Sequence, residues 1–437
     1  MLKLKNIEKD KFDKYVENHK EKSHFLQSLA WGEFAKIKKN LTPHYLGLVD
    51  ENDEILGATL LLEKKLPMKF TYFYAPRGFV IDYNNKDLVK TMTKKVVEYI
   101  KPKKAIFLKI DPDLIKTQYN YLNEETPNDD YEKIFNTIKE TGFKHLGFTK
   151  NFETMQPRYT FRIDLNQDLE DIEEHFSKTT KQRIAKSIKL ETEVEIGKKE
   201  DVKEFYHLMT LTENRKDFIG YNEDYYETLY EVLNGTPSTK ATLFLGKIVF
   251  NKTIKALEKN LKNINNQISI LPIDNLSKSA KAKLTELTKQ KENINSEIDK
   301  YKEYKKEYGQ EIILSAHMII EYGDKAWVLY AGNHNIMTES YVNYNTYYEH
   351  IKYCKNKGYK IYDQFGTIGD LSKSNPRLGL HEFKKKFGGN YIEFIGEWDY
   401  IINKPMYFVF TKLVPLYRKM IRNKSKKALK NETSQSN

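Results

Sequence analysis

A nine-residue, mostly apolar stretch occurs twice in the chain, once at residues 55–63 and again at residues 313–321. Each copy has the length and composition typical of a buried strand. A short polar or proline-containing turn follows each copy, and an aromatic strand is then predicted at residues 70–75 and at residues 326–331. The same pair of consecutive strands is therefore predicted in two distant parts of the chain.

An amphipathic helix is predicted after each pair, at residues 87–100 and 341–356, and one more strand follows each helix, at residues 105–111 and 360–365. The order strand–strand–helix–strand thus occurs twice. This repeat predicts an α/β (α+β) fold with two similar lobes, and a cleft between lobes is a preferred place for a ligand.

Another pattern separates the strands predicted at residues 241–250 and 312–321. Apolar residues recur there at spacings of three, four or seven, which is typical of a coiled-coil seam. The seam positions are Leu257, Leu261, Ile264, Ile268 and Leu271, and, after a predicted turn at residues 272–275, Leu284, Leu287, Ile294, Ile298 and Tyr301. We therefore expect an antiparallel coiled-coil helical hairpin over residues 251–308, either a solvated structural arm or a contact surface for a partner or a second copy.

The composition narrows the class of protein. A chain of 437 residues with 39% hydrophobic residues fits two cores and an accessory element. The net charge of +12 favours polyanionic partners, namely nucleic acid, anionic lipid surfaces or phosphorylated substrates. The single cysteine, Cys354, excludes an internal disulfide and a cysteine zinc site, and we interpret it as a packed residue. The histidines show no metal-ligand spacing, so no metal site is predicted.

The two ends of the chain bear on its location. Residues 1–8 lack the apolar run of a signal peptide, and no stretch is long enough for a membrane span, so we predict a cytoplasmic protein. Near the other end an aromatic stripe at residues 405–414 leads into a basic segment at residues 418–430. Such a segment can lie on an anionic membrane. The alternative is a docked helix with a solvated tail.

Several common motifs are absent. No GxGxxG follows a predicted strand, no Walker loop is present, and no GxSxG elbow occurs. A glycine-rich pyrophosphate loop of the kind that CoA-dependent acetyltransferases use is also missing. These absences argue against dinucleotide enzymes, P-loop enzymes and α/β-hydrolases.

Ten short segments, in order along nearly the whole chain, form a further pattern. They are residues 26–36, 77–83, 109–113, 156–158, 180–189, 214–218, 363–366, 383–388, 395–400 and 403–405. Together they resemble the Fem-type aminoacyltransferases, bacterial enzymes that attach amino acids from aminoacyl-tRNA to the peptide of a cell-wall precursor.

The resemblance implies two acetyltransferase-like (GNAT-like) lobes. Lobe 1 would comprise residues 1–150, completed by residues 381–437, and lobe 2 would comprise residues 151–250 and 309–380, with the arm at residues 251–308 inserted. It also implies peripheral contact with the cytoplasmic face of the membrane and association with copies of itself or with other Fem-type proteins.

The reaction implied is attack by the stem-peptide amine of lipid II, or of a UDP-linked muropeptide, on the ester of aminoacyl-tRNA during cross-bridge synthesis. Glycine, alanine and serine are the candidate amino acids. Because the ester is already activated, aminoacyl-tRNA is a co-substrate and no cofactor or metal is expected. Alignment of the reactants can supply about 7–11 kcal/mol of the barrier reduction.

The resemblance also assigns roles to single residues. Lys384 follows Phe383 as in the family's Phe-Lys pair, and would offset the developing oxyanion or the charge at the 3′ end of the tRNA. The alternative is a solvated lysine in the run 384–386. Phe383 is counted as substrate-binding, and Lys36 and Arg215 match positions that hold the phosphates of the precursor.

Two assignments carry open alternatives. Asp111 ends a buried strand and is a candidate general base, or else a turn cap before Pro112. The basic helix with Lys181, Arg183 and Lys186 is a candidate contact for the tRNA backbone, or else a solvated face.

Two other functions compete with the leading one. The first is a CoA-dependent N-acyltransferase on the same fold, against which the missing pyrophosphate loop counts. The second is a non-catalytic tRNA- or membrane-binding scaffold that uses the arm and the basic tail.

Overall fold

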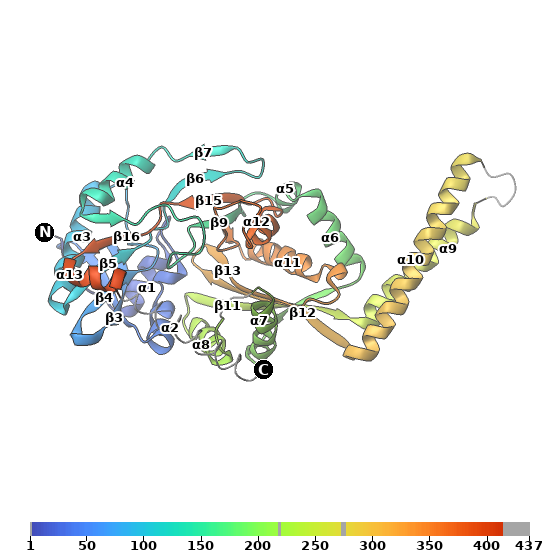
Figure 1. Ribbon diagram of the computed structural model, residues 1–437, viewed down its shortest axis with the longest axis horizontal. Helices are drawn as coiled ribbons and strands as arrows, with labels where there is room; N and C mark the ends of the chain where they lie inside the picture. Colours follow the sequence, from blue (N-terminus) through green and yellow to red (C-terminus); the bar gives the residue numbers. More distant parts are fainter. Residues whose placement is uncertain (1, 217–219, 272–276, 414–437) are drawn as a thin grey trace, which may run out of the picture.

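The strands of the protein form two sheets (Figure 1). The computed structural model describes residues 2–216, 220–271 and 277–413. The first sheet has seven strands, in the spatial order β1 (Lys3–Asn6), β2 (Thr42–Val49), β3 (Ile55–Lys65), β4 (Thr71–Ala75), β5 (Ala105–Ile110), β16 (Trp398–Ile401) and β8 (Phe143–His145).

The second sheet has nine strands. Their spatial order is β10 (Glu193–Gly197), β11 (Thr239–Val249), β12 (Glu311–Tyr322), β13 (Lys325–Asn333), β14 (Ile361–Asp363), β9 (Tyr159–Asp164), β15 (Asn390–Phe394), β6 (Ile115–Tyr119) and β7 (Glu125–Pro127).

Helices cover these sheets and connect their strands. In chain order they are α1 (Lys9–Glu17), α2 (Leu29–Lys39), α3 (Lys86–Ile100), α4 (Tyr131–Glu140), α5 (Leu169–Glu174), α6 (Lys178–Lys189), α7 (Val202–Lys216), α8 (Glu223–Asn234), α9 (Phe250–Ser269), α10 (Lys278–Tyr308), α11 (Val342–Asn356), α12 (Leu378–Lys385) and α13 (Lys404–Phe408).

The repeat predicted from the sequence is present in the structure. Strands β3 and β4 are antiparallel and β4 and β5 are parallel, with α3 between β4 and β5. Strands β12, β13 and β14 repeat these pairings, with α11 between β13 and β14. Parallel neighbours need a long crossover connection, which the two helices supply. A mixed α/β fold with two similar sheets is therefore confirmed, whereas the description of each lobe as acetyltransferase-like stays a prediction.

Some strands lie in the sheet of the other half of the sequence. Strands β6 and β7 come from the first 150 residues yet belong to the nine-stranded sheet. Of the segment predicted to complete lobe 1, residues 381–437, β16 joins the seven-stranded sheet and β15 joins the nine-stranded one. The chain therefore passes between the two sheets more than once. The predicted domain limits stay a prediction.

One hydrophobic core joins the two halves. It combines buried side chains of α2 and β3, such as Phe34 and Leu62, with buried side chains of α7, β12 and β13, such as Leu208, Met318 and Trp327. Burial of apolar surface stabilises the interface between halves just as it stabilises each half. The two sheets are thus held at one relative position by continuous packing.

The sequence of residues 24–38 predicts a helix with Ser23 as its N-cap, but the observed α-helix begins later. The α-helix α2 starts at Leu29, and the hydroxyl of Ser28, not of Ser23, accepts a hydrogen bond from the backbone N–H of Trp31. A 3-10 turn (Phe25–Gln27) precedes it, capped by His24. The expectation of Ser23 as the cap was wrong, because both serines satisfy the local capping rule and only packing selects between them.

Helices α9 and α10 form the arm seen at the right of Figure 1. Six of the predicted seam residues are buried in one cluster along these helices, namely Leu257, Ile264, Leu287, Ile294, Ile298 and Tyr301. The arm interrupts the hairpin of β11 and β12, whose last register pair joins Val249 to Glu311. The supercoiled geometry of a coiled coil stays a prediction, and the predicted turn at 272–275 lies outside the described residues.

The C-terminal aromatic stripe is only partly described. Helix α13 and the π-helix Val409–Leu413 contain Tyr407 and Phe410, whose rings pack against Phe107. The basic segment at residues 418–430 lies outside the described residues. None of the helices described is long and apolar enough to cross a membrane.

Candidate functional site

The side chain of Lys384 is buried against the backbone that follows β14. Its Nζ donates hydrogen bonds to the carbonyl oxygens of Gln364, Phe365 and Gly366, at 2.7, 2.5 and 2.7 Å. These three acceptors match the three hydrogens of an ammonium group. Burial lowers the pKa of Lys384 to about 7, and the nearby Asp363 carboxylate opposes that shift. Lys384 thus joins α12 to residues 364–366.

The lysine run is resolved by this arrangement. Of residues 384–386, only Lys384 is buried. Phe383 is half-buried and points to the other side, where its ring lies 5.1 Å from Tyr344 and 5.0 Å from Tyr347. The structure therefore places Phe383 in a cluster of aromatic rings between α11 and α12.

Asp111 lies directly after β5 and is also buried. Its carboxylate accepts hydrogen bonds from the hydroxyl of Tyr74 at 2.8 Å and from the backbone N–H of Arg77 at 2.7 Å. Burial raises the pKa of Asp111 to about 7; the Arg77 guanidinium opposes this shift and Glu397 adds to it. Arg77 has a φ of 59°, so this carboxylate holds a left-handed turn in place.

A chain of contacts links these two candidates. The guanidinium of Arg77 donates hydrogen bonds to the carbonyl of Pro157 at 3.3 Å. Gly366 packs so closely on Pro157 that an added Cβ would lie 2.7 Å from the proline ring. Asp111 and Lys384 therefore hold neighbouring loops, one after each central parallel strand of the repeat.

A buried ionic bridge, which the sequence analysis did not assign, connects the same region. The Arg162 guanidinium lies 2.6 Å from the carboxylate of Asp113 and 2.8 Å from that of Asp363. Burial alone would raise the pKa of Asp113, but Arg162 and other cations hold this pKa well below its ordinary value. The partners lie 49 and 201 residues away in sequence, so no local pattern could have shown the bridge.

A cavity of about 620 Å³ opens between the two halves of the chain beside this bridge. Arg162 lines it together with Lys22 and Lys325, whose pKa values burial lowers, that of Lys325 to about 8. Ile361, the first residue of β14, also lines the cavity, whereas Lys384 holds the residues after the end of β14. The lining of the cavity thus includes the first residue of β14 but neither Lys384 nor residues 364–366.

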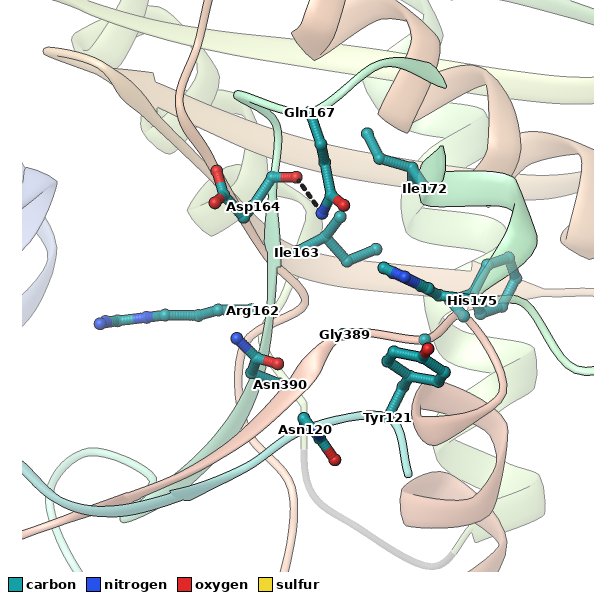
Figure 2. A pocket seen from close by; sticks show the side chains of 12 residues that line it. Asn120, Tyr121, Arg162, Ile163, Asp164, Gln167, Ile172, His175, Gly389 and Asn390 are labelled. Atoms are coloured by element: carbon teal, nitrogen blue, oxygen red, sulfur yellow. Dashed lines mark hydrogen bonds between the residues drawn. The ribbon is translucent and has the colours of Figure 1, made fainter. Parts of the chain in front are cut away.

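A smaller pocket of about 140 Å³ adjoins the cavity and shares Arg162 and Asp164 with it (Figure 2). The rings of Tyr121 and His175 stack there at 4.0 Å, and Gln167 donates a hydrogen bond to the backbone carbonyl of Asp164 at 2.9 Å. Its polar groups are therefore largely paired within the protein.

Lys36 and Arg215 lie apart from these buried groups. Lys36 is exposed in the last turn of α2, and Arg215 is exposed near the end of α7, where it donates to the carbonyl of Asn333 at 3.3 Å. Helix α8 contacts both α2 and α7. Between these helices and β13 lies a cluster of tyrosine rings, made by Tyr221, Tyr225, Tyr226 and Tyr330. The two predicted phosphate ligands thus lie on helices that both pack against α8, which carries two of these tyrosines.

The three basic residues of α6 differ in their surroundings. Lys181 is exposed. Arg183 stacks on the rings of Tyr341 and Tyr344, at 5.2 and 4.9 Å, and so shares Tyr344 with Phe383. Lys186 pairs with Glu297 of α10 at 3.0 Å, which ties α6 to the arm.

Within the described ranges, no group of three or more histidine, cysteine, aspartate or glutamate side chains is arranged to hold a metal ion. Cys354 is buried in a hydrophobic cluster of α11 and the nine-stranded sheet, in agreement with its interpretation as a packed residue.

Three comparisons with known proteins each find a match over nearly the whole chain. A profile of the FemAB family matches residues 7–414. Proteins called lipid II:glycine glycyltransferase are similar over 94% of this chain and 95% of their own length: one from Staphylococcus epidermidis is 28% identical and one from Staphylococcus haemolyticus is 30% identical. The crystal structure of FemX superposes with a TM-score of 0.77 at 27% identity, and the match covers 93% of this chain and 99% of that one.

Proposed function

Because the chain belongs to the FemAB family, we propose that it is an aminoacyltransferase that adds an amino acid to the stem-peptide amine of lipid II or of a related peptidoglycan precursor. The observation that carries this proposal is similarity along almost the whole chain to lipid II:glycine glycyltransferases. Relatives of this kind make glycine the first amino acid to test, with alanine and serine next.

The amino acid would come from aminoacyl-tRNA. In the proposed step the amine nitrogen attacks the ester carbon, a new amide C–N bond forms, and the bond from that carbon to the ribose oxygen of the tRNA breaks. The ammonium of the acceptor loses its proton before attack, and the ribose oxygen gains one on leaving. No redox cofactor or metal is needed for this balance.

The candidate residues would share this work in two ways. Lys36 and Arg215, both exposed, would bind phosphate groups of the acceptor. Lys384 and Asp111 are buried and hydrogen-bonded to the protein itself, so we assign them first to holding the loops beside the reacting groups. Lys384 would offset the negative charge that develops on the ester oxygen. It would do so either from its place behind the 364–366 backbone, which it orients, or after breaking its hydrogen bond to one of the three carbonyls.

The exposed basic side chains of α6 and the projecting arm indicate where partners would bind. Lys181 and the stacked Arg183 would contact the tRNA backbone, and the arm would extend that contact or bind a second Fem-type chain. With lipid II as the acceptor substrate, the protein would work at the cytoplasmic face of the membrane, as a peripheral protein.

A transfer assay tests the proposal. The full chain is incubated with lipid II and with tRNA charged with glycine, alanine or serine, and the acceptor is analysed by mass spectrometry. We expect the mass of one amino-acid residue to be added from at least one charged tRNA. Uncharged tRNA with free amino acid, and acetyl-CoA, serve as controls. If none of the charged tRNAs modifies lipid II or the UDP-linked muropeptide, the proposal is wrong.

A further inference from the structure

Exposed apolar side chains gather in two segments of the surface. Seventeen large hydrophobic residues are exposed in the described part of the chain, and six of them lie in residues 146–155 and 371–380. These six are Leu146, Phe148, Phe152, Met155, Leu371 and Leu380. Apolar groups concentrated in this way mark an interaction surface more often than scattered ones do.

The two segments lie against each other although they are far apart in sequence. The side-chain amide of Asn375 donates a hydrogen bond to that of Asn151 at 2.8 Å, and the Arg377 guanidinium lies 5.0 Å from the ring of Phe152. Their exposed side chains therefore belong to one surface rather than to two unrelated loops.

This surface is firmly anchored to the fold. The backbone N–H of Leu146 donates to the carbonyl of Glu397 at 2.9 Å, and that of Met155 donates to the Glu397 carboxylate, which also pairs with Lys109. Side chains on an anchored loop keep their exposure without the entropy loss of ordering a mobile one.

Basic groups dominate the rim. Residues 144–155 and 370–386 contain seven basic side chains, of which Lys384 is buried, and three acidic ones, Glu153, Asp370 and Glu382. The six basic side chains that are not buried are Lys144, Lys150, Lys373, Arg377, Lys385 and Lys386. Apolar residues with a basic rim match a bilayer that carries anionic headgroups, since the apolar side chains enter the headgroup boundary and the cations face phosphate.

The surface also borders the candidate site. An added Cβ on Gly366 would lie 2.9 Å from the ring of Phe152, and Lys384 donates a hydrogen bond to the carbonyl of Gly366. We propose that residues 146–155 and 371–380 form a docking surface for an anionic phospholipid bilayer, which holds the segment after β14 close to the membrane that carries a lipid-linked acceptor. This inference rests on the proposed function, because that function requires a substrate embedded in the membrane.

Vesicle sedimentation tests the surface directly. The full chain is mixed with vesicles of phosphatidylglycerol and phosphatidylcholine, and with vesicles of phosphatidylcholine alone. We expect binding to the anionic vesicles that weakens as salt is raised. The double variant Met155→Glu/Leu371→Glu should lower this binding by roughly tenfold or more, because two apolar side chains no longer enter the boundary.

A matched control carries the same charge change elsewhere. Leu56 and Ile196 are exposed to a similar extent, 40% and 52%, against 52% for Met155 and 48% for Leu371. The variant Leu56→Glu/Ile196→Glu should bind vesicles within about twofold of the wild type. If the Met155 and Leu371 variant unfolds, Lys150→Gln/Lys373→Gln gives an independent test, with an expected loss of about fivefold per lysine.

The outcomes separate this inference from the function on which it rests. The Met155 and Leu371 variant should lose transfer to membrane-embedded lipid II and keep transfer to a water-soluble UDP-linked muropeptide. A wild-type protein that ignores anionic vesicles, or a control variant that loses as much binding, overturns the docking surface even if transfer occurs. A change of mass in analytical ultracentrifugation without vesicle binding would make the surface a contact between copies, which also overturns it. Vesicle binding through this surface without transfer to any acceptor would instead refute the proposed function.

Discussion

The Nζ of Lys384 lies 2.7 Å from the carbonyl oxygen of Gly366, and this bond closes a set of three that hold the chain just after β14. An amine in this position has two separable consequences. It stabilises the loop, and it places a positive charge beside the surface where the proposed reaction occurs.

Replacing Lys384 with methionine removes both the hydrogen bonds and the charge, and measurements of stability and of transfer report the two losses separately. Methionine keeps the apolar stem and leaves three buried carbonyls without their donor, so the free energy of unfolding should fall by about 2–4 kcal/mol. Urea denaturation measures this change, with Lys385→Met as the control from the same helix. A variant that keeps wild-type stability but loses transfer would instead mark Lys384 as a catalytic residue.

Asp111 should make stability depend on pH. Its pKa in the folded protein is raised to about 7, above the unfolded value, so the folded state binds more protons between about pH 4 and pH 7. The contribution of Asp111 to stability is therefore fully present below about pH 4 and is lost as the pH rises towards 7, by up to ~4 kcal/mol. The difference in unfolding free energy between the wild type and Asp111→Asn, measured across this range, should show that slope. A difference that does not vary with pH would contradict the prediction.

Breaking the buried bridge should destabilise both sheets together. In Arg162→Met the carboxylates of Asp113 and Asp363 lose their shared cation, at an expected cost of about 3–5 kcal/mol. Chemical denaturation and hydrogen exchange of the segments around both aspartates measure the effect. Arg162→Lys should recover only part of it, because a lysine cannot pair with two carboxylates in the geometry of a guanidinium. Normal stability of Arg162→Met would show that the bridge contributes no net stability.

Lys36 and Arg215 should act on substrate binding alone. Both are exposed, so Lys36→Ala and Arg215→Ala should change the unfolding free energy by less than about 0.5 kcal/mol. Each should raise the KM for the phosphate-bearing acceptor about tenfold, because a charge-assisted hydrogen bond is lost. Lys94→Ala, an exposed lysine of α3, is the control. An unchanged KM for both variants would remove them from the acceptor site.

The arm should be dispensable for folding. Strands β11 and β12 pair up to Val249 and Glu311, and the base of the arm contains Leu257 and Ile294. Replacing residues 260–290 by a short glycine-rich loop keeps that base, so the main thermal transition should shift by no more than about 3 °C. Calorimetry checks this, and transfer measured on the shortened protein then reports what the arm contributes to activity. A much larger shift would show that the outer part of the arm stabilises the two sheets.

The sequence by itself determined the local elements and their repetition. Apolar runs, turn residues and heptad spacing depend on neighbours within a few residues, and they were sufficient to predict the strand–strand–helix–strand order in both halves and the helices α9 and α10. They were not sufficient to choose Ser28 over Ser23 as the cap of α2, because both serines offer the same local chemistry.

Only the tertiary structure decided which polar groups meet. Lys384 finds its carbonyls about 20 residues away, Arg162 finds its carboxylates 49 and 201 residues away, and the segments around Asn151 and Asn375 meet across 224 residues. The sequence placed Lys384 among the candidate residues by resemblance and Asp111 by its position at the end of a predicted buried strand. It could not show which backbone groups each of them would bond. Burial and long-range pairing are properties of the packed chain, since they depend on the crossing of strands between the two sheets, and no periodicity along the sequence records them.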